Sequence, residues 1–292
     1  MEENKSEEKK RDYLIPVSIL LSAIIIAVGL IYRAGVSVIP VPNSVQNTFN
    51  SDDRTANLSV KWEDLGAQMI KAGVIDQAKF ESVYPGGLNA EEKSLLSGTG
   101  NGGLNITKAN AGIILNLLWA IGLSNKNQIL ENGPMMDPRY GGAGNFASTG
   151  GWTLSVGNAM NHYSKHNFIN LTPEQQALVE KVSKNIYRPC CSNSVYFPDC
   201  NHGMAMLGLL ELMASQGADE ATMYRSALLA NSLWFSDNYA NIGQYLAEKG
   251  VNMNNVPPQN ILGVEFSSAA GYQKVVEALK PTQKDGSSCG VQ

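Results

Sequence analysis

The longest uninterrupted apolar stretch of the chain lies near its N-terminus. Residues 14–32 are rich in Ile, Leu, Val and Ala and contain no charged side chain. At about 1.5 Å of rise per residue, a helix of this length approaches the roughly 30 Å hydrocarbon core of a bilayer. The pattern therefore predicts a transmembrane signal anchor over residues 13–33, which would contact the lipid bilayer through residues 14–32.

The charges that flank this stretch predict its orientation. Four basic residues precede it and only Arg33 follows it closely, so the positive-inside rule places the N-terminus in the cytoplasm and the rest of the chain outside the plasma membrane. A cleaved signal peptide is the alternative, but its apolar region usually has about 7–15 residues. The longer stretch favours an uncleaved, single-pass anchor.

Beyond the anchor, the polarity pattern divides the chain into three parts. Residues 34–60 are rich in Asn, Ser, Thr and Pro and predict a linker. Residues 61–280 have apolar positions at three- and four-residue spacing, which predicts a helical extracytoplasmic domain. Residues 281–292 predict a flexible tail that carries Cys289. Residues 1–12, ahead of the anchor, predict a charged cytoplasmic tail.

Capping residues and glycines set the expected helix boundaries. Thr107 can cap a strongly apolar helix over 108–123, and Thr172-Pro173-Glu174-Gln175 forms a capping box for a helix that Pro189 must stop. No stretch alternates convincingly like a strand, so the predicted fold class is all-α. The remaining expected helices cover 200–216, 219–234 and 238–249.

Composition narrows the classes of function. The chain is 43% apolar and 16% charged with a net charge of -4, which suits a globular domain and favours no nucleic-acid partner. Gly142, Gly144 and Ala147 match a dinucleotide-binding pattern, but no predicted strand precedes them. A glycine-rich loop packed beneath Trp152 is expected instead, with no nucleotide cofactor. Because no nucleophile-elbow motif occurs, a hydrolase is not expected.

Candidate chemistry is concentrated in the window 162–202, which holds all three histidines and three of the four cysteines. If residues 158–168 are helical, His162 and His166 lie on one face and form half of a metal site. Tyr163 stands where a zinc protease would need glutamate, so protease chemistry is disfavoured. Two surface histidines without a ligand role are the alternative.

The cysteines give the more specific signal. Cys190 and Cys191 are adjacent, and Pro198-Asp199 resembles the start of a helix whose first turn would hold Cys200 and His202. Unpaired backbone N–H groups and the helix dipole at this position lower the pKa of a thiol. The resulting thiolate can either bind a metal or attack a disulfide.

Three interpretations of the window stay open. In the first, a site for zinc or copper forms from the six residues His162, His166, Cys190, Cys191, Cys200 and His202, with Met204 and Met206 as candidate thioether donors or simply as core residues. In the second, Cys200 forms a structural disulfide with Cys190 or Cys191. In the third, these three cysteines exchange disulfides, with Cys289 as a partner.

A short resemblance supports the third interpretation. The proline-cysteine cluster, the cysteine at a helix start and the segment Gln216-Gly217-Ala218-Asp219-Glu220 resemble bacterial membrane-tethered cytochrome c maturation thiol proteins and small cysteine-cluster lipoproteins. The resemblance covers Pro189 to Leu228 and implies thiol-disulfide chemistry. Adjacent Cys190 and Cys191 depart from the C-x-x-C spacing of the first family.

The sequence as a whole predicts a membrane-anchored extracytoplasmic protein that binds zinc or copper in a structural or metal-handling role. A thiol-disulfide oxidoreductase is the alternative if the protein is an enzyme. A disulfide-stapled domain that binds an unknown extracytoplasmic protein is the third hypothesis.

Overall fold

A computed structural model describes residues 55–280 of the chain. The predicted anchor, most of the predicted linker and the tail with Cys289 lie outside these residues. Within 55–280, no helix combines the length and the apolar character needed to cross a membrane. The predicted location, orientation and protein partner stay predictions.

The all-α prediction is wrong, because the described domain begins with a strand. Strand β1 (Thr55–Glu63) pairs antiparallel with β2 (Asn101–Thr107) in a two-stranded sheet. Every second residue of β1 is buried, although residues 55–60 fall within the predicted linker. Their Asn, Ser and Thr side chains, which suggested a linker, lie on the exposed face between the buried residues Ala56, Leu58, Val60 and Trp62.

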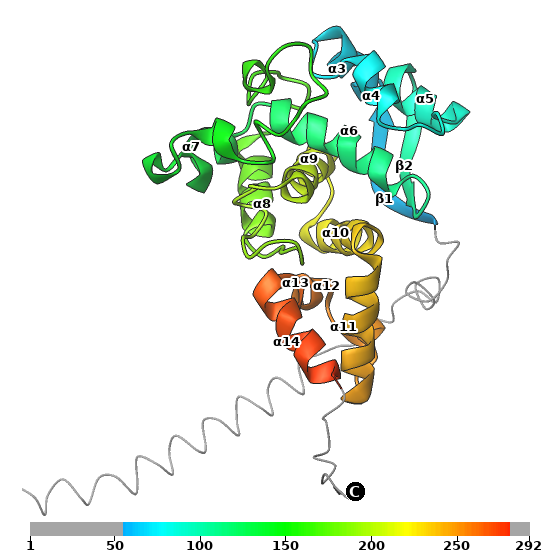
Figure 1. The fold of residues 1–292 in the computed structure, drawn as a ribbon, viewed down its shortest axis with the longest axis vertical. Helices are drawn as coiled ribbons and strands as arrows, with labels where there is room; N and C mark the ends of the chain where they lie inside the picture. The colour runs from blue at the N-terminus through cyan, green and yellow to red at the C-terminus, as the bar shows by residue number, and fades with distance from the viewer. Residues whose placement is uncertain (1–54, 281–292) are drawn as a thin grey trace, which may run out of the picture. The chain divides into compact units, whose positions relative to one another are not determined.

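Two long apolar helices, α6 (Ala111–Ser124) and α9 (Asn201–Ser215), pack against each other in the core (Figure 1). A Cβ atom on Gly122 of α6 would lie 2.1 Å from the Met204 carbonyl oxygen, so the backbones touch directly. The predicted helices 108–123 and 200–216 are thereby confirmed to within a few residues. Met204 and Met206 are buried core residues.

Helix α8 (Pro173–Ser183) packs on α9 and begins with the predicted capping box. It ends at Ser183, before Pro189 is reached. Helix α10 (Glu220–Trp234) contacts α9, α6 and β1, and confirms the prediction for 219–234. Shorter helices complete this part of the fold: α3 (Leu65–Lys71), α4 (Gln77–Ser82), α5 (Ala90–Ser97) and α7 (Gln128–Asn132).

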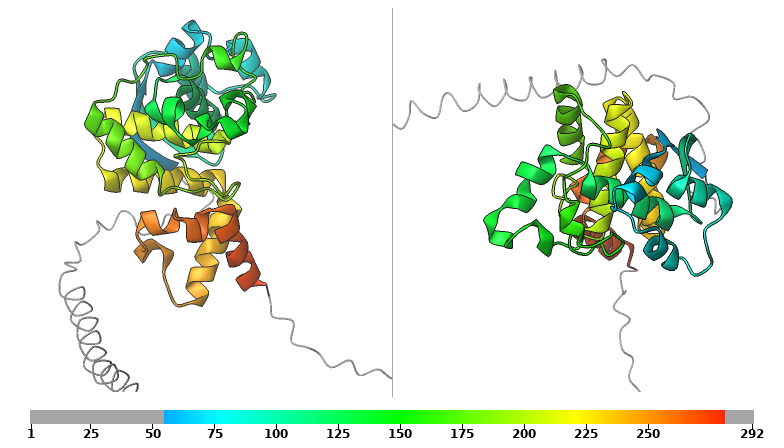
Figure 2. Two further views of the ribbon diagram at one scale, coloured as in Figure 1. Left: turned by 90° about the vertical axis from the view of Figure 1, so that its left-hand side faces the viewer. Right: turned by 90° about the horizontal axis from the view of Figure 1, so that it is seen from above.

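The C-terminal helices gather beyond α10 at one end of the domain (Figure 2). Helix α11 (Ser236–Glu248) packs against α14 (Ala269–Leu279), and α10 contacts both α11 and the short α12 (Pro258–Ile261). Gly250, with φ at 73°, follows α11 as the sequence predicted. A four-residue helix, α13 (Val264–Ser267), lies between α12 and α14.

The segment expected to be a histidine helix is not one. It contains only a 3-10 turn, Ala159–Asn161, followed by irregular turns. Within the segment, the backbone at Ser164 adopts a positive φ angle of 51°, which a continuous right-handed helix does not allow. Ahead of it, the buried Trp152 donates from Nε1 to the Val74 carbonyl at 2.9 Å.

Candidate metal and thiol site

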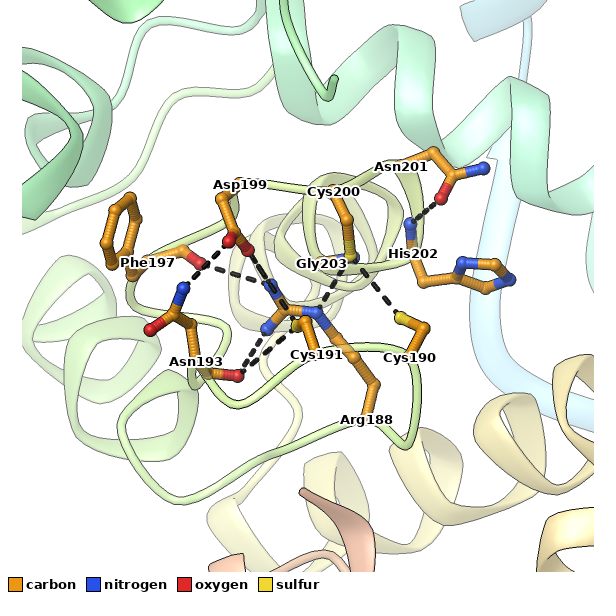
Figure 3. Close-up of polar contacts among 10 residues, drawn as sticks. All are labelled: Arg188, Cys190, Cys191, Asn193, Phe197, Asp199, Cys200, Asn201, His202 and Gly203. Atoms are coloured by element: carbon orange, nitrogen blue, oxygen red, sulfur yellow. Dashed lines mark hydrogen bonds and ion pairs between the residues drawn. The ribbon is translucent and has the colours of Figure 1, made fainter. Parts of the chain in front are cut away.

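The three described cysteines come together in the segment between α8 and α9. Its backbone folds back on itself, with the Cys191 amide donating to the Arg188 carbonyl and the Val195 amide to the Ile186 carbonyl. Figure 3 shows Arg188 in the middle of this fold, between Asp199 and the cysteines. We call residues 188–200 the cysteine loop.

Cys200 is the N-cap of α9, which confirms its predicted place at a helix start. Its backbone is extended, and its Sγ accepts a hydrogen bond from the Gly203 amide at 3.5 Å. A sulfur thus takes the position that a Ser or Asp oxygen usually fills, beside the positive end of the helix dipole. His202 lies in the first turn, as predicted.

Arg188 is the centre of the cysteine loop and was missed at the sequence level. Its side chain is 1% exposed, and Nε donates to Cys200 Sγ at 3.1 Å. Its Nη atoms donate to the Asn193 and Phe197 carbonyls and, at 2.6 Å, to the Asp199 carboxylate. The only sequence signal was a charged residue directly before the Pro-Cys-Cys segment.

Gly203 makes room for this arginine. A Cβ atom at that position would lie 2.6 Å from Arg188 Cζ. The guanidinium therefore lies flat against the first turn of α9, where any larger residue would displace it. Asn193 supports the other side, since its Nδ2 donates to Asp199 Oδ2 at 2.7 Å.

The donor atoms form two overlapping groups. Atoms of Cys190, Cys200 and His202 lie within 4.8 Å of one another, and so do atoms of Cys191, Asp199 and Cys200. Cys190 Sγ and Cys200 Sγ are 3.6 Å apart and are not bonded. Cys191 Sγ lies 3.8 Å from both the Asn193 carbonyl oxygen and Asp199 Oδ1. Cys200 is the residue common to both groups.

The three thiols do not share one ionisation behaviour. Hydrogen bonds from Cys190 and then Cys191, helped by His202 and the charge of Arg188, hold the pKa of Cys200 far below its usual range despite burial. The hydrogen bonds to Cys191 and Cys200, with a smaller effect from the partial burial of its sulfur, raise the pKa of Cys190, although the residue as a whole is exposed. The negative charge of a thiolate is therefore favoured on Cys200 over Cys190.

Cys191 is intermediate between the other two. Its hydrogen bond with Cys190 lowers its pKa, but the hydrogen bond it gives to Cys200 and its burial raise the pKa to about 11 overall. It is therefore a thiol at neutral pH.

His202 is held by aromatic rings and lacks a polar partner at one nitrogen. Its ring centroid lies 4.4 Å from that of Phe235 and 5.9 Å from that of Trp234. Within the described part of the chain, its buried Nδ1 has no hydrogen-bond partner. A buried polar atom without a partner is costly, and a metal ion would satisfy it.

His162 and His166 also lie together, but not in either group of three or more metal-ligating side chains found within residues 55–280. His162 Nδ1 and His166 Nε2 are 3.0 Å apart, and His162 Nε2 is 3.3 Å from the Val156 carbonyl oxygen. These contacts use three of the four ring nitrogens of the pair. A metal-binding role for this pair stays a prediction.

The backbone of the cysteine loop is tied to the C-terminal helices. The Tyr187 amide donates to the Leu262 carbonyl at 2.8 Å, and Asn231 of α10 donates to the Tyr187 carbonyl. On the other side of the arginine, the Ala269 amide at the start of α14 donates to the Cys191 carbonyl at 2.9 Å. Tyr187, directly before the cysteine loop, and Cys191 within it are thus both hydrogen-bonded to residues outside the loop.

A second polar centre lies inside the core. Glu211 of α9 is fully buried, and its two carboxylate oxygens accept hydrogen bonds from Asn125 and Asn127 at 2.7 and 2.6 Å. Burial raises its pKa well above the usual value, against the effect of both hydrogen bonds. The sequence signal was an acidic residue within the apolar stretch Met204–Met213.

No family model matches the chain, and neither a curated protein nor a solved structure is similar to it. The resemblance noted for residues 189–228 stays a prediction. The geometry itself shows that a Cys/His group, formed by Cys190, Cys191, Cys200 and His202, could hold a metal ion.

Proposed function

We propose that the cysteine loop binds one Zn²⁺ ion reversibly through Cys190, Cys200 and His202. The observation that carries this proposal is the convergence of two sulfurs and a histidine nitrogen within 4.8 Å, at a histidine whose buried Nδ1 has no other partner. Two sulfurs on a tetrahedral zinc ion, each at about 2.3 Å, would be about 3.8 Å apart. The 3.6 Å between Cys190 Sγ and Cys200 Sγ is close to this value.

Charge balance favours a divalent ion with this donor set. Two thiolates neutralise Zn²⁺, while Asp199 neutralises Arg188, so the occupied site carries no net charge if Cys191 keeps its proton. Cu⁺ on the same donors would leave one uncompensated negative charge beside a largely buried arginine. Sulfur and imidazole ligands suit both ions, so the net charge of the occupied site is what favours Zn²⁺ over Cu⁺.

Exposure of the ligands favours reversible binding over a purely structural site. Cys190 is exposed, whereas Cys200 and His202 are partly buried. A competing ligand can therefore reach the metal from the Cys190 side. This arrangement supports a metal-handling role, in which the ion enters and leaves through Cys190.

The test is zinc affinity of the full, reduced chain, measured by competition with a chromogenic chelator. We expect one zinc ion per chain. Cys200→Ser should lower the zinc affinity by at least about 100-fold, because removing a ligand costs more than changing a residue that only supports the ligands. Serine is itself a good N-cap, so this substitution retains the start of α9. His202→Ala should also weaken binding, whereas His166→Ala serves as the matched control.

Equal zinc affinity in the wild type and in Cys200→Ser would contradict the proposal. A matching loss in His166→Ala would do the same, because it would place the ion elsewhere. Tight Cu⁺ binding with weak Zn²⁺ binding would contradict the choice of zinc, while the same three residues would still be the ligands.

Thiol-disulfide exchange is the second candidate function, and one observation favours it. Cys190 is exposed and its sulfur lies 3.6 Å from Cys200 Sγ, which Arg188 and the start of α9 stabilise as a thiolate. An exchange factor would equilibrate with glutathione disulfide through this pair without any metal. Failure to bind zinc, combined with rapid exchange, would select this candidate.

A further inference from the structure

Two of the proposed zinc ligands are also positioned to react with each other. Cys190 is an exposed residue, and its Sγ lies 3.6 Å from Cys200 Sγ. A disulfide needs about 2.0 Å between the sulfurs, so a small side-chain movement would be enough. The same two atoms cannot form that bond and hold a metal at once.

Cys191 is less suited to this reaction. Its Sγ lies 3.8 Å from both the Asn193 carbonyl oxygen and Asp199 Oδ1, and Cys191 is less exposed than Cys190. A bond between Cys190 and Cys191 would have to close a ring across adjacent residues, which strains the peptide between them. The geometry therefore selects the pair Cys190 and Cys200.

The remaining contacts hold the loop in place during such a change. Arg188 keeps its bonds to the Asn193 and Phe197 carbonyls and to Asp199 when the sulfur of Cys200 is oxidised. The Gly203 amide can still donate to Cys200 Sγ at the N-cap position, although a disulfide sulfur is a weaker acceptor than a thiolate. The loop can thus alternate between two states of the sulfurs without unfolding α9.

We infer that a hydroperoxide converts Cys190 and Cys200 into a disulfide and thereby releases the metal ion. This inference rests on the proposed zinc site and adds its regulation. The metal would be held under reducing conditions and delivered when peroxide is present.

The reaction balances as follows. In the proposed zinc-loaded site, Cys190 has already given up its proton and is a thiolate. Its sulfur attacks the terminal oxygen of the hydroperoxide, the O–O bond breaks, and Cys190 becomes a sulfenic acid while an alkoxide or hydroxide leaves. The Cys200 thiolate then attacks the Cys190 sulfur, forms the S–S bond and expels hydroxide. Two thiolates lose two electrons, the peroxide gains them, and two protons from the buffer convert the two anionic leaving groups into water, or into water and an alcohol.

The experiment uses the full, reduced chain loaded with zinc and treated with hydrogen peroxide. Zinc release is followed with a chromogenic chelator, thiols are counted, and the disulfide is located by peptide mass spectrometry. We expect about one zinc released for every two thiols lost, a Cys190–Cys200 linkage, and recovery of zinc binding after reduction. Cys191→Ser retains both reacting thiols and should behave in the same way.

Three results would overturn the inference: zinc retained after the disulfide forms, zinc lost without a disulfide, or a linkage that contains Cys191. Failure of the zinc site itself shows earlier, as absent binding in the reduced chain before peroxide is added. In that case the proposed function and the inference both fall.

Discussion

Arg188 gives the cysteine loop its shape, because one buried side chain makes four hydrogen bonds to separate parts of it. We expect Arg188→Met to lower the free energy of unfolding by about 2–4 kcal/mol, since it removes four hydrogen bonds and the cation that pairs with the Asp199 carboxylate. Arg188→Lys should lower the free energy of unfolding by a smaller amount, because an ammonium group keeps the charge but cannot reach all of the same acceptors. Urea denaturation measures both.

The matched control for Arg188 is Arg225→Met. Arg225 is exposed and hydrogen-bonded only locally, to Thr222 in the preceding turn of α10. Its replacement should change stability by less than about 0.5 kcal/mol. Equal effects of the two substitutions would refute the role given to Arg188.

The buried side chain of Glu211 makes the stability of the fold depend on pH. Burial raises its pKa in the folded protein well above the ordinary 4.5, so the folded chain keeps a proton that the unfolded chain releases. Its contribution to stability is therefore fully present below about pH 4.5 and is lost as the pH rises through the folded pKa. The slope reaches at most about 1.4 kcal/mol per pH unit.

The comparison variant is Glu211→Gln, which has no proton to lose. We expect the stability of the wild type, relative to this variant, to decline as the pH rises above about 4.5. Denaturation series at several pH values measure this difference, and Glu91→Gln on the exposed face of α5 is the control. A difference that does not vary with pH would rule out the buried proton.

At the scale of elements, the contact between α6 and α9 depends on glycine. Gly122→Ala should lower the free energy of unfolding by about 1–3 kcal/mol, because its Cβ would collide with the Met204 carbonyl oxygen and push the helices apart. Gly112→Ala, near the start of the same helix, meets no atom within 4 Å. That control should leave stability unchanged or raise it by up to about 1 kcal/mol. Destabilisation by both substitutions would show that helix contact is not the cause.

The sequence predicted those elements whose boundaries are set by local chemistry. The capping box at Thr172 and the positive-φ glycine after α11 act within a few residues, so they could be recognised without tertiary context. Strand β1 could not, because its polar composition suggested a linker and its partner β2 lies about 40 residues further on. Cys200 was located by its helix start, whereas Arg188 acquires its role only when the loop folds around it.

At the scale of the whole molecule, zinc binding at the proposed site would add to the stability of the fold. A ligand that binds only the folded state at 100 times its dissociation constant contributes about 2.7 kcal/mol. We expect zinc to raise the unfolding temperature of the reduced chain and a chelator to reverse the effect, as measured by calorimetry. The Cys200→Ser variant should unfold at the same temperature with and without zinc. An equal zinc effect in that variant would point to binding at another site.

The hydrogen bond between the Ala269 amide and the Cys191 carbonyl joins the cysteine loop to the first residue of α14. Cys191 lies next to one proposed ligand and contacts the arginine-supported core of the loop, yet its main chain anchors a helix more than 70 residues away in the sequence. That carbonyl belongs to the peptide between Cys191 and Ser192, so a rotation of this peptide would break the hydrogen bond to α14. The position of α14 therefore depends on the backbone of the cysteine loop, and a change in that backbone would reach the surface of the domain through its C-terminal helix.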